Sequence, residues 1–271
     1  ESVDSNKFRY RFAEYNVDGT FKHVPRSLVG AYKGYMTSNK LYSRSGVRPT
    51  VSQSTTSFDN FANARGQGYQ RIDFQQHCVI AFMLYAKYGN RNLQAVLGTG
   101  GAVSGSSATM TGTSNSTGIT DTKNETSKYV CGLGLEGVFG GIYEWVKGVE
   151  INNRVWKITD PDGSTRNVNA GTSDGWITNV AAENGPFFDM VPTNVGGSET
   201  THYSDYYYQN SGGPLVLARS CVDSGTVGGV AYAAAVADAS VTDSCCGSRL
   251  AFRGVIREAE SVSAFKALSV L

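Results

Sequence analysis

The sequence predicts an α+β fold that is loop-rich, with short antiparallel strands and about two helices. Glycine occurs 32 times in 271 residues and charged residues make up only 17% of the chain, a composition that favours turns, loops and strands over long helices. The clearest helical periodicity is confined to residues 73–88. Elsewhere, short apolar runs alternate with Gly, Asn, Asp and Pro, which punctuate strands.

The overall composition is that of a globular chain with a sizeable core. The net charge is +1 and 40% of the residues are hydrophobic, so nothing in the charge balance favours nucleic acid or a membrane surface as a partner. The longest apolar run, residues 78–86, is far shorter than the roughly 18 residues of a membrane span. Because the chain opens at Glu1 without an initiator or a signal-like segment, we expect it to be processed or trimmed.

The first third of the chain predicts short strands followed by helices. Residues 7–24 alternate loosely around a turn at 16–19, which indicates strand, turn and strand, and short strands follow at 28–36 with a turn at 37–40. A first helix is expected from an N-cap at Ser57 to a stop at Gly66. The main helix should run from its cap Asp73 to Tyr88, with a wide apolar stripe, and end at Gly89.

The middle of the chain predicts loops and hairpins. Residues 98–129 are rich in Gly, Ser, Thr and Asn and indicate a long surface excursion. Residues 132–137 spell GxGxxG, but the glycine-broken aromatic stretch behind them is no helix, so we reject a dinucleotide site. The turn at 160–163 predicts a hairpin, and residues 250–255 predict a terminal strand.

The cysteines and carboxylates nominate no catalytic or metal site. Cys78 and Cys131 stand in apolar contexts and are expected to be buried thiols. Cys245 and Cys246 are adjacent, but no second Cys/His pair stands at zinc-like spacing. We find no catalytic triad. We therefore predict neither a metal nor a cofactor, and we expect Glu136 and Glu144 to bond backbone rather than act as an acid–base pair.

The segment from Tyr203 to Val255 has an unusual composition. Between Glu199 and Glu258 there is no Lys, Glu, Met or Trp, although a solvated surface normally carries Lys and Glu. Three consecutive tyrosines, residues 206–208, precede long runs of small residues. The choice of residues in this segment therefore follows something other than solubility.

Two motifs carry a resemblance to a known family. Gly140-Gly141-Ile142-Tyr143-Glu144-Trp145 resembles the glycine–asparagine–apolar–aromatic–Glu–Trp motif of the formylglycine-generating-enzyme branch of the C-type-lectin fold. Gly247-Ser248-Arg249-Leu250-Ala251-Phe252-Arg253 resembles the closing Gly-aromatic-Arg-Leu-Ala/Val motif of that branch. The chain departs from the motifs at Gly141, where asparagine is usual, and at Ser248, where an aromatic is usual. The similarity covers residues 20–257, and the nearest look-alikes are variable proteins of diversity-generating retroelements, including phage tropism determinants.

The resemblance implies a diversified binding surface at about residues 205–253. In that family, adenine-directed mutagenesis produces NNC codons, which cannot encode Lys, Glu, Gln, Met or Trp, and residues 200–257 hold only Gln209 of these. The tyrosines would supply rigid amphipathic contact area, as in antibody paratopes. The predicted ligand-binding positions are Tyr206, Tyr207, Tyr208, Leu215, Cys221, Val222, Asp223, Thr226, Val227, Ala234, Val236, Val241, Asp243, Cys245 and Cys246.

The resemblance favours a non-enzymatic receptor-binding protein. The expected domains are N-terminal strands at 1–24, a C-type-lectin-like ligand-binding domain at 25–257 and a tail at 258–271. The expected partner is a protein or glycan receptor on a cell surface, with display on a phage tail or a bacterial surface and a homo-oligomer for avidity, a trimer being a guess. Two alternatives stay open: an oxidase of the formylglycine-generating type, and a calcium-dependent carbohydrate lectin, whose characteristic Glu-Pro-Asn or Gln-Pro-Asp triplets are absent.

Overall fold

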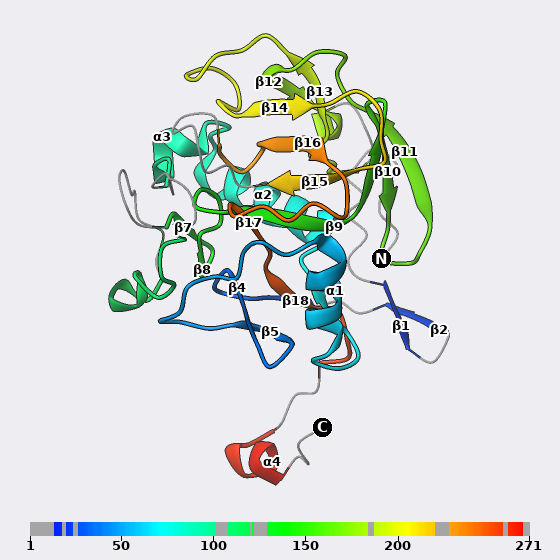
Figure 1. Cartoon of the computed structure of the whole chain (residues 1–271). Helices are drawn as coiled ribbons and strands as arrows, with labels where there is room; N and C mark the ends of the chain where they lie inside the picture. Colours follow the sequence, from blue (N-terminus) through cyan, green and yellow to red (C-terminus); the bar gives the residue numbers. More distant parts are fainter. Residues whose placement is uncertain are drawn as a thin grey trace.

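A computed structural model describes residues 14–17, 20–23, 27–100, 108–119, 121, 129–183, 187–219, 228–256 and 260–267. Within these ranges the chain is mixed α+β and consists mainly of strands, as the sequence predicted, and its largest element is a curled sheet (Figure 1). The predicted positions Cys221, Val222, Asp223, Thr226 and Val227 lie outside the described residues.

The helices of the described chain are short apart from one. They are α1 (Thr55–Asn63), α2 (Phe74–Tyr88), α3 (Leu93–Leu97) and α4 (Val262–Ala267), with two 3₁₀ turns, η1 (Asn115–Thr117) and η2 (Ala181–Glu183). The prediction for α2 is confirmed, because Asp73 closes a capping box with Gln76 and Gly89 ends the helix at φ 58°. The predicted start of α1 was three residues late: Ser54 is its N-cap and accepts from the Ser57 N–H at 3.1 Å. None of the described helices has the length and apolarity needed to cross a membrane.

Half of the described strands, nine of eighteen, belong to one sheet, and the others form small sheets around it. The order in the large sheet is β11-β10-β9-β15-β16-β14-β12-β13. Strand β17 pairs with the first two residues of β9, Tyr143 and Glu144. Its strands are β9 (Tyr143–Asn152), β10 (Val155–Thr159), β11 (Thr165–Asn169), β12 (Gly175–Val180), β13 (Pro192–Val195), β14 (Tyr206–Gln209), β15 (Leu215–Arg219), β16 (Ala233–Ala237) and β17 (Cys246–Gly247).

The smaller sheets come from both ends of the chain. The terminal strand β18 lies between β3 and β6, so residues near the C-terminus pair with residues near the N-terminus. The remaining strands are β1 (Glu14–Val17), β2 (Thr20–His23), β3 (Leu28–Val29), β4 (Gly34–Thr37), β5 (Lys40–Ser43), β6 (Tyr69–Arg71), β7 (Cys131–Gly132), β8 (Leu135–Glu136) and β18 (Leu250–Phe252).

The large sheet separates two hydrophobic cores, since successive side chains of a strand point to opposite faces. One face packs on α2 and α3 and holds Trp156, Tyr207 and Leu217 in the main core. The other face packs on α1 and β5 and carries a smaller cluster that includes Trp145 and Tyr232. Figure 1 shows α2 behind the sheet and α1 below it. The second cluster covers only part of its face and leaves room for a site.

Several local predictions from the sequence are confirmed. The turn at 160–163 joins β10 to β11, and Gly163 N–H donates to the Asp160 carbonyl at 2.8 Å. The turn at 37–40 joins β4 to β5. The GxGxxG stretch forms the short antiparallel pair β7–β8 instead of a strand-to-helix turn. Cys78 and Cys131 are buried free thiols.

Candidate functional site

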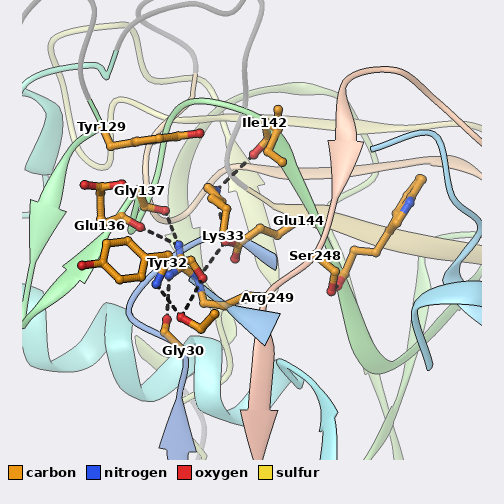
Figure 2. Close-up of polar contacts among 12 residues, drawn as sticks. Gly30, Tyr32, Lys33, Tyr129, Glu136, Gly137, Ile142, Glu144, Ser248 and Arg249 are labelled. Carbon is orange, nitrogen blue, oxygen red and sulfur yellow. Dashed lines mark hydrogen bonds and ion pairs between the residues drawn. The ribbon is translucent and has the colours of Figure 1, made fainter. Parts of the chain in front are cut away.

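A buried ionic network lies where the two family-like motifs meet (Figure 2). Arg249 is 1% exposed, and its Nε donates to Glu144 Oε1 at 2.9 Å. Its two terminal nitrogens donate to the carbonyls of Gly30, Glu136 and Gly137, each at 2.8 Å. Four partners on three separate stretches of chain therefore fix this one guanidinium.

Lys33 completes the network from the N-terminal part of the chain. Its Nζ lies 3.0 Å from Glu144 Oε1 and donates to the Ile142 carbonyl at 3.1 Å. Burial alone would raise the pKa of Glu144, but the charges of Arg249 and Lys33 outweigh it and lower this pKa to about 2. The carboxyl is thus ionised and locked between two cations. It is a structural group and cannot serve as a proton donor near neutral pH.

A second carboxylate, Glu136, bonds backbone as the sequence predicted. Its side-chain oxygens accept from Gly112 N–H at 2.8 Å and from Ser114 N–H at 3.0 Å. It therefore pins the stretch around η1 to the β7–β8 hairpin.

A second set of buried polar groups holds the stretch that leads into β16. Asp205 accepts from Ala231 N–H at 2.8 Å, and His77 Nε2 lies 3.1 Å from the Val230 carbonyl. Arg219 is fully buried and donates to the carbonyls of Ala231 and Tyr232. These contacts all come from the main-core side of the sheet. They fix the backbone just before Tyr232, whose ring lies on the other side.

A cavity of about 350 Å³ opens on the face of the sheet opposite α2. Its floor comes from β9, β15, β16 and β14, and its wall comes from the loop between β16 and β17. The described lining residues are Tyr143, Trp145, Tyr208, Ala218, Tyr232, Ala234, Val236, Ala237, Val241, Asp243, Cys245 and Cys246. The volume falls within the range of small-ligand sites in proteins.

Aromatic rings run in a row from the cavity across the sheet. The centroids of Tyr143 and Tyr232 are 5.9 Å apart, those of Tyr232 and Tyr208 6.2 Å, and those of Tyr208 and Tyr206 4.4 Å. Trp176 extends the row with a centroid 5.4 Å from that of Tyr206. Rings at such separations support one another, and the row adds an apolar surface with polar edges to the cavity.

The loop of residues 238–245 forms the wall and is tied to the first residue of α1 and to Ser52 just before the helix. The Asp243 carbonyl accepts from Ser52 N–H at 2.9 Å, and the Ala239 carbonyl accepts from Thr55 Oγ1 at 3.1 Å. Within the loop, Asp243 Oδ1 accepts from Cys245 N–H at 2.6 Å. These bonds use the backbone of the loop or its short Asx turns, and Val241 and Asp243 line the cavity from it.

The structure brings seven of the predicted positions together around this cavity. They are Tyr208, Ala234, Val236, Val241, Asp243, Cys245 and Cys246. Tyr206 lies beside Tyr208 in the aromatic row. The structure places Tyr207 in the main core with no exposed surface, because it sits one position out of phase with its neighbours on β14. Leu215 also packs into the main core, although its edge borders an adjoining groove.

Sequence reasoning missed the aromatic residues that come from outside the tyrosine run. Tyr143 and Trp145 stand in the family-like motif, but only the pairing of β9 with β15 and β17 brings them to the cavity. Tyr232 also lines the cavity, although it is not among the predicted ligand-binding positions. Alternation along β9 was the available signal, since Glu144 must face away from its two neighbours.

A groove of about 680 Å³ adjoins the cavity and shares Val236, Ala237 and Val241 with it. Its other described lining residues are Val149, Glu150, Gly213, Pro214, Leu215, Val216, Asp238, Ala239 and Ser240. Across the residues that the structure describes, no group of three or more His, Cys, Asp or Glu side chains is arranged to hold a metal ion.

The chain was compared with known protein families and with curated proteins. The sequence matches no family model, and the search of curated proteins found no significant match.

Proposed function

We propose that the chain is a ligand-binding protein of the variable type, with a C-type-lectin fold of the formylglycine-generating-enzyme branch and a diversified face at about residues 205–253. The observation that carries the proposal is the gathering of seven predicted positions around one cavity. Six of these residues lie within 234–246, on β16, the wall loop and β17, and the pairing of β14 with β16 brings Tyr208 to them.

The buried network supports the proposed fold. Glu144 comes from the first motif and Arg249 from the second, and the two are ion-paired at 2.9 Å. Gly141, which departs from the motif, has φ 70°, a conformation that glycine and asparagine both tolerate. The backbone angle therefore suits either residue, but a Cβ at this position would lie 2.7 Å from the Tyr129 ring, so an asparagine here would require that ring to move.

A binding role also agrees with the separation between the residues that hold the backbone and those that line the cavity. The network holds the backbone of β9 and the smaller cluster packs Trp145 and Tyr232 beneath the cavity, while Tyr208, Val236, Val241 and Asp243 line it with exposed or half-buried side chains. Such an arrangement allows side chains at the face to change without a change of fold. We place the protein outside the cell, on a phage tail or a bacterial surface, with a receptor protein or glycan as its partner and oligomerisation as a source of avidity.

The test is a display library that randomises Tyr208, Val236, Val241 and Asp243 with NNC codons. We expect most members to resist protease as the parent does, and selection against a panel of cell-surface proteins and glycans to yield binders. A control library randomises four residues with exposed side chains on β10 and β11: Lys157, Thr159, Thr165 and Asn167. Loss of protease resistance in the first library, or equal yields of binders from both, would contradict the proposal.

A second candidate, the oxidase alternative, keeps one observation in its favour. Cys245 and Cys246 are adjacent in the chain, and both line the cavity. Oxidase chemistry of that type requires reactive paired cysteines. Titration with Cu(I) and measurement of thiol reactivity discriminate between the two functions: stoichiometric copper binding that is lost in Cys246→Ser would favour the enzyme.

A further inference from the structure

We propose that the cavity binds the alkylammonium group of a lysine side chain on a partner polypeptide, whose backbone lies in the adjoining groove. This proposal rests on the proposed function, because it names the ligand class of the same site.

The first argument is the chemistry of the lining. Four of the lining residues described above are aromatic: Tyr143, Trp145, Tyr208 and Tyr232. The faces of aromatic rings are electron-rich and attract cations within about 6 Å of the ring centroid. Several rings around one hollow therefore favour a cation that carries apolar methylene groups, which is the structure of a lysine side chain.

The second argument is charge complementarity. Asp243 is the one formally charged side chain among the described lining residues of the cavity, and Lys and Arg are absent from them. One oxygen of its carboxylate, Oδ1, accepts from Cys245 N–H at 2.6 Å. The other, Oδ2, has no hydrogen bond or ion pair to any described residue, so one carboxylate oxygen remains for an incoming ammonium group.

The groove extends the same complementarity. Its described lining includes two more carboxylates, Glu150 and Asp238, and again no Lys or Arg. Because the groove shares three residues with the cavity, a chain lying in it can send one side chain into the cavity. A polypeptide thus fits both hollows, whereas a small ammonium compound would fill only one.

A neutral sugar is the main competitor for an aromatic hollow. Recognition of several hydroxyl groups draws on side chains that place donors and acceptors at fixed positions. Asn, Gln, Arg, Lys and His are all absent from the described cavity lining. The polar groups that remain there are tyrosine hydroxyls, thiols, the indole N–H of Trp145 and one carboxylate, which suits a compact cation better than a ring of hydroxyls.

The experiment compares two capped pentapeptides, Gly-Gly-Lys-Gly-Gly and the same peptide with norleucine in place of lysine. Binding to the full chain is followed by the NMR shifts of ring-labelled tyrosines, which suits weak affinities. We expect saturable shifts with the lysine peptide and at least about fivefold weaker binding of the norleucine peptide, since one cation–π contact accounts for about that factor. n-Butylammonium should shift the same resonances but bind more weakly than the lysine peptide.

Matched variants separate the site from general charge effects. Asp243→Asn should weaken the lysine peptide about three- to fivefold and leave the norleucine peptide unchanged. Asp162→Asn is the control, because Asp162 also accepts from a backbone N–H two residues on, at 2.9 Å, but lies in the β10–β11 turn away from both hollows. It should change neither affinity. Tyr208→Leu should weaken the lysine peptide about fivefold.

Three outcomes would overturn the cation proposal. The first is equal binding of the two peptides, which would make the cavity merely apolar. The second is the absence of any NMR shift when the lysine peptide is added to about 20 mM, since a dissociation constant weaker than this would mean negligible affinity. The third is saturation of the same tyrosines by a neutral methyl glycoside and not by lysine. Binders selected from the display library alongside any of these outcomes would leave the proposed function standing and remove only the ligand class.

Discussion

Strand β9 passes through two different surroundings within three residues. Glu144 points into the buried network, where its partners are two cations at 2.9 and 3.0 Å. Its neighbours Tyr143 and Trp145 point to the cavity, where most contacts are between rings and small side chains. A buried charge that loses its partner is strongly destabilising, whereas a side chain at an open face can be exchanged at little cost. The same strand thus carries two residues that are fixed, Glu144 and the buried Trp145, and one half-buried residue, Tyr143, that can be replaced at lower cost.

The two sides of β9 differ because the interactions on the network side are directional and those on the cavity side are not. Ion pairs and hydrogen bonds require atoms at set positions, so the network admits one solution. Contacts at the cavity are dispersive and open to solvent, and they accept many shapes. We expect substitutions on the two sides to differ by several kcal/mol in their effect on the free energy of unfolding, and the following changes test that difference.

The largest effect is expected from Arg249→Met. The change leaves the Glu144 carboxylate with one cation instead of two and removes the donor to the carbonyls of Gly30, Glu136 and Gly137. We expect a loss of about 3–5 kcal/mol in the free energy of unfolding, as for other broken buried ion pairs. Urea unfolding measures it. Arg44→Met, at an exposed position, is the control and should change stability by less than about 0.5 kcal/mol.

A smaller contrast is expected between two adjacent tyrosines of β14. Tyr207→Leu removes a ring with no exposed surface, at a centroid distance of 6.4 Å from the Trp156 ring, and should cost about 2–4 kcal/mol. Tyr208→Leu changes a ring that is 37% exposed and should cost less than about 1 kcal/mol. Equal losses by urea unfolding would mean that the two faces of β14 do not differ in the way described.

The tyrosine run also shows what the sequence could and could not predict. Helix α2 was predictable because its cap, its apolar stripe and its terminal glycine are all local signals. Three identical residues in a row carry no alternation, so nothing in the run marks Tyr207 as the buried one. The sequence predicted Tyr208, Val236 and Asp243 as ligand-binding positions because the segment that contains them has an unusual composition. It could not find Tyr143, because that residue reaches the cavity through strand pairing over long separations in sequence.

An intermediate effect is expected in the pH dependence of stability, through two groups buried on the main-core side of β16. Burial, with the Arg219 charge, lowers the pKa of His77 to about 3, and burial raises the pKa of Asp205 to about 7. Between pH 4.5 and 6 the unfolded chain binds one more proton at His77, so this residue makes stability rise with pH. In the same window the folded chain binds one more proton at Asp205, which makes stability fall with pH. The two slopes oppose each other in the parent chain.

Substituting one of the two groups at a time should reveal the pH dependence of stability that the other contributes. In Asp205→Asn, stability should rise by about 1–2 kcal/mol more than in the parent from pH 4.5 to pH 6, since one proton accounts for about 1.4 kcal/mol per pH unit. In His77→Gln, stability should instead fall relative to the parent over that range. Urea unfolding at four pH values gives both slopes. Parallel curves for all three proteins would show that neither group titrates differently on folding.

The smallest effects are expected at the cavity face itself, and they are the sharpest measure of the contrast. Val236 is 48% exposed and lines both hollows, while Ala235 beside it on β16 has no exposed surface. Val236→Thr and Val241→Ser should each change the free energy of unfolding by less than about 0.5 kcal/mol, alone or combined. Ala235→Val adds only two methyl groups but forces them into the main core, and should cost about 1–3 kcal/mol. If the face variants cost as much as Ala235→Val, the side chains of the cavity are part of the frame and the face is not free to vary.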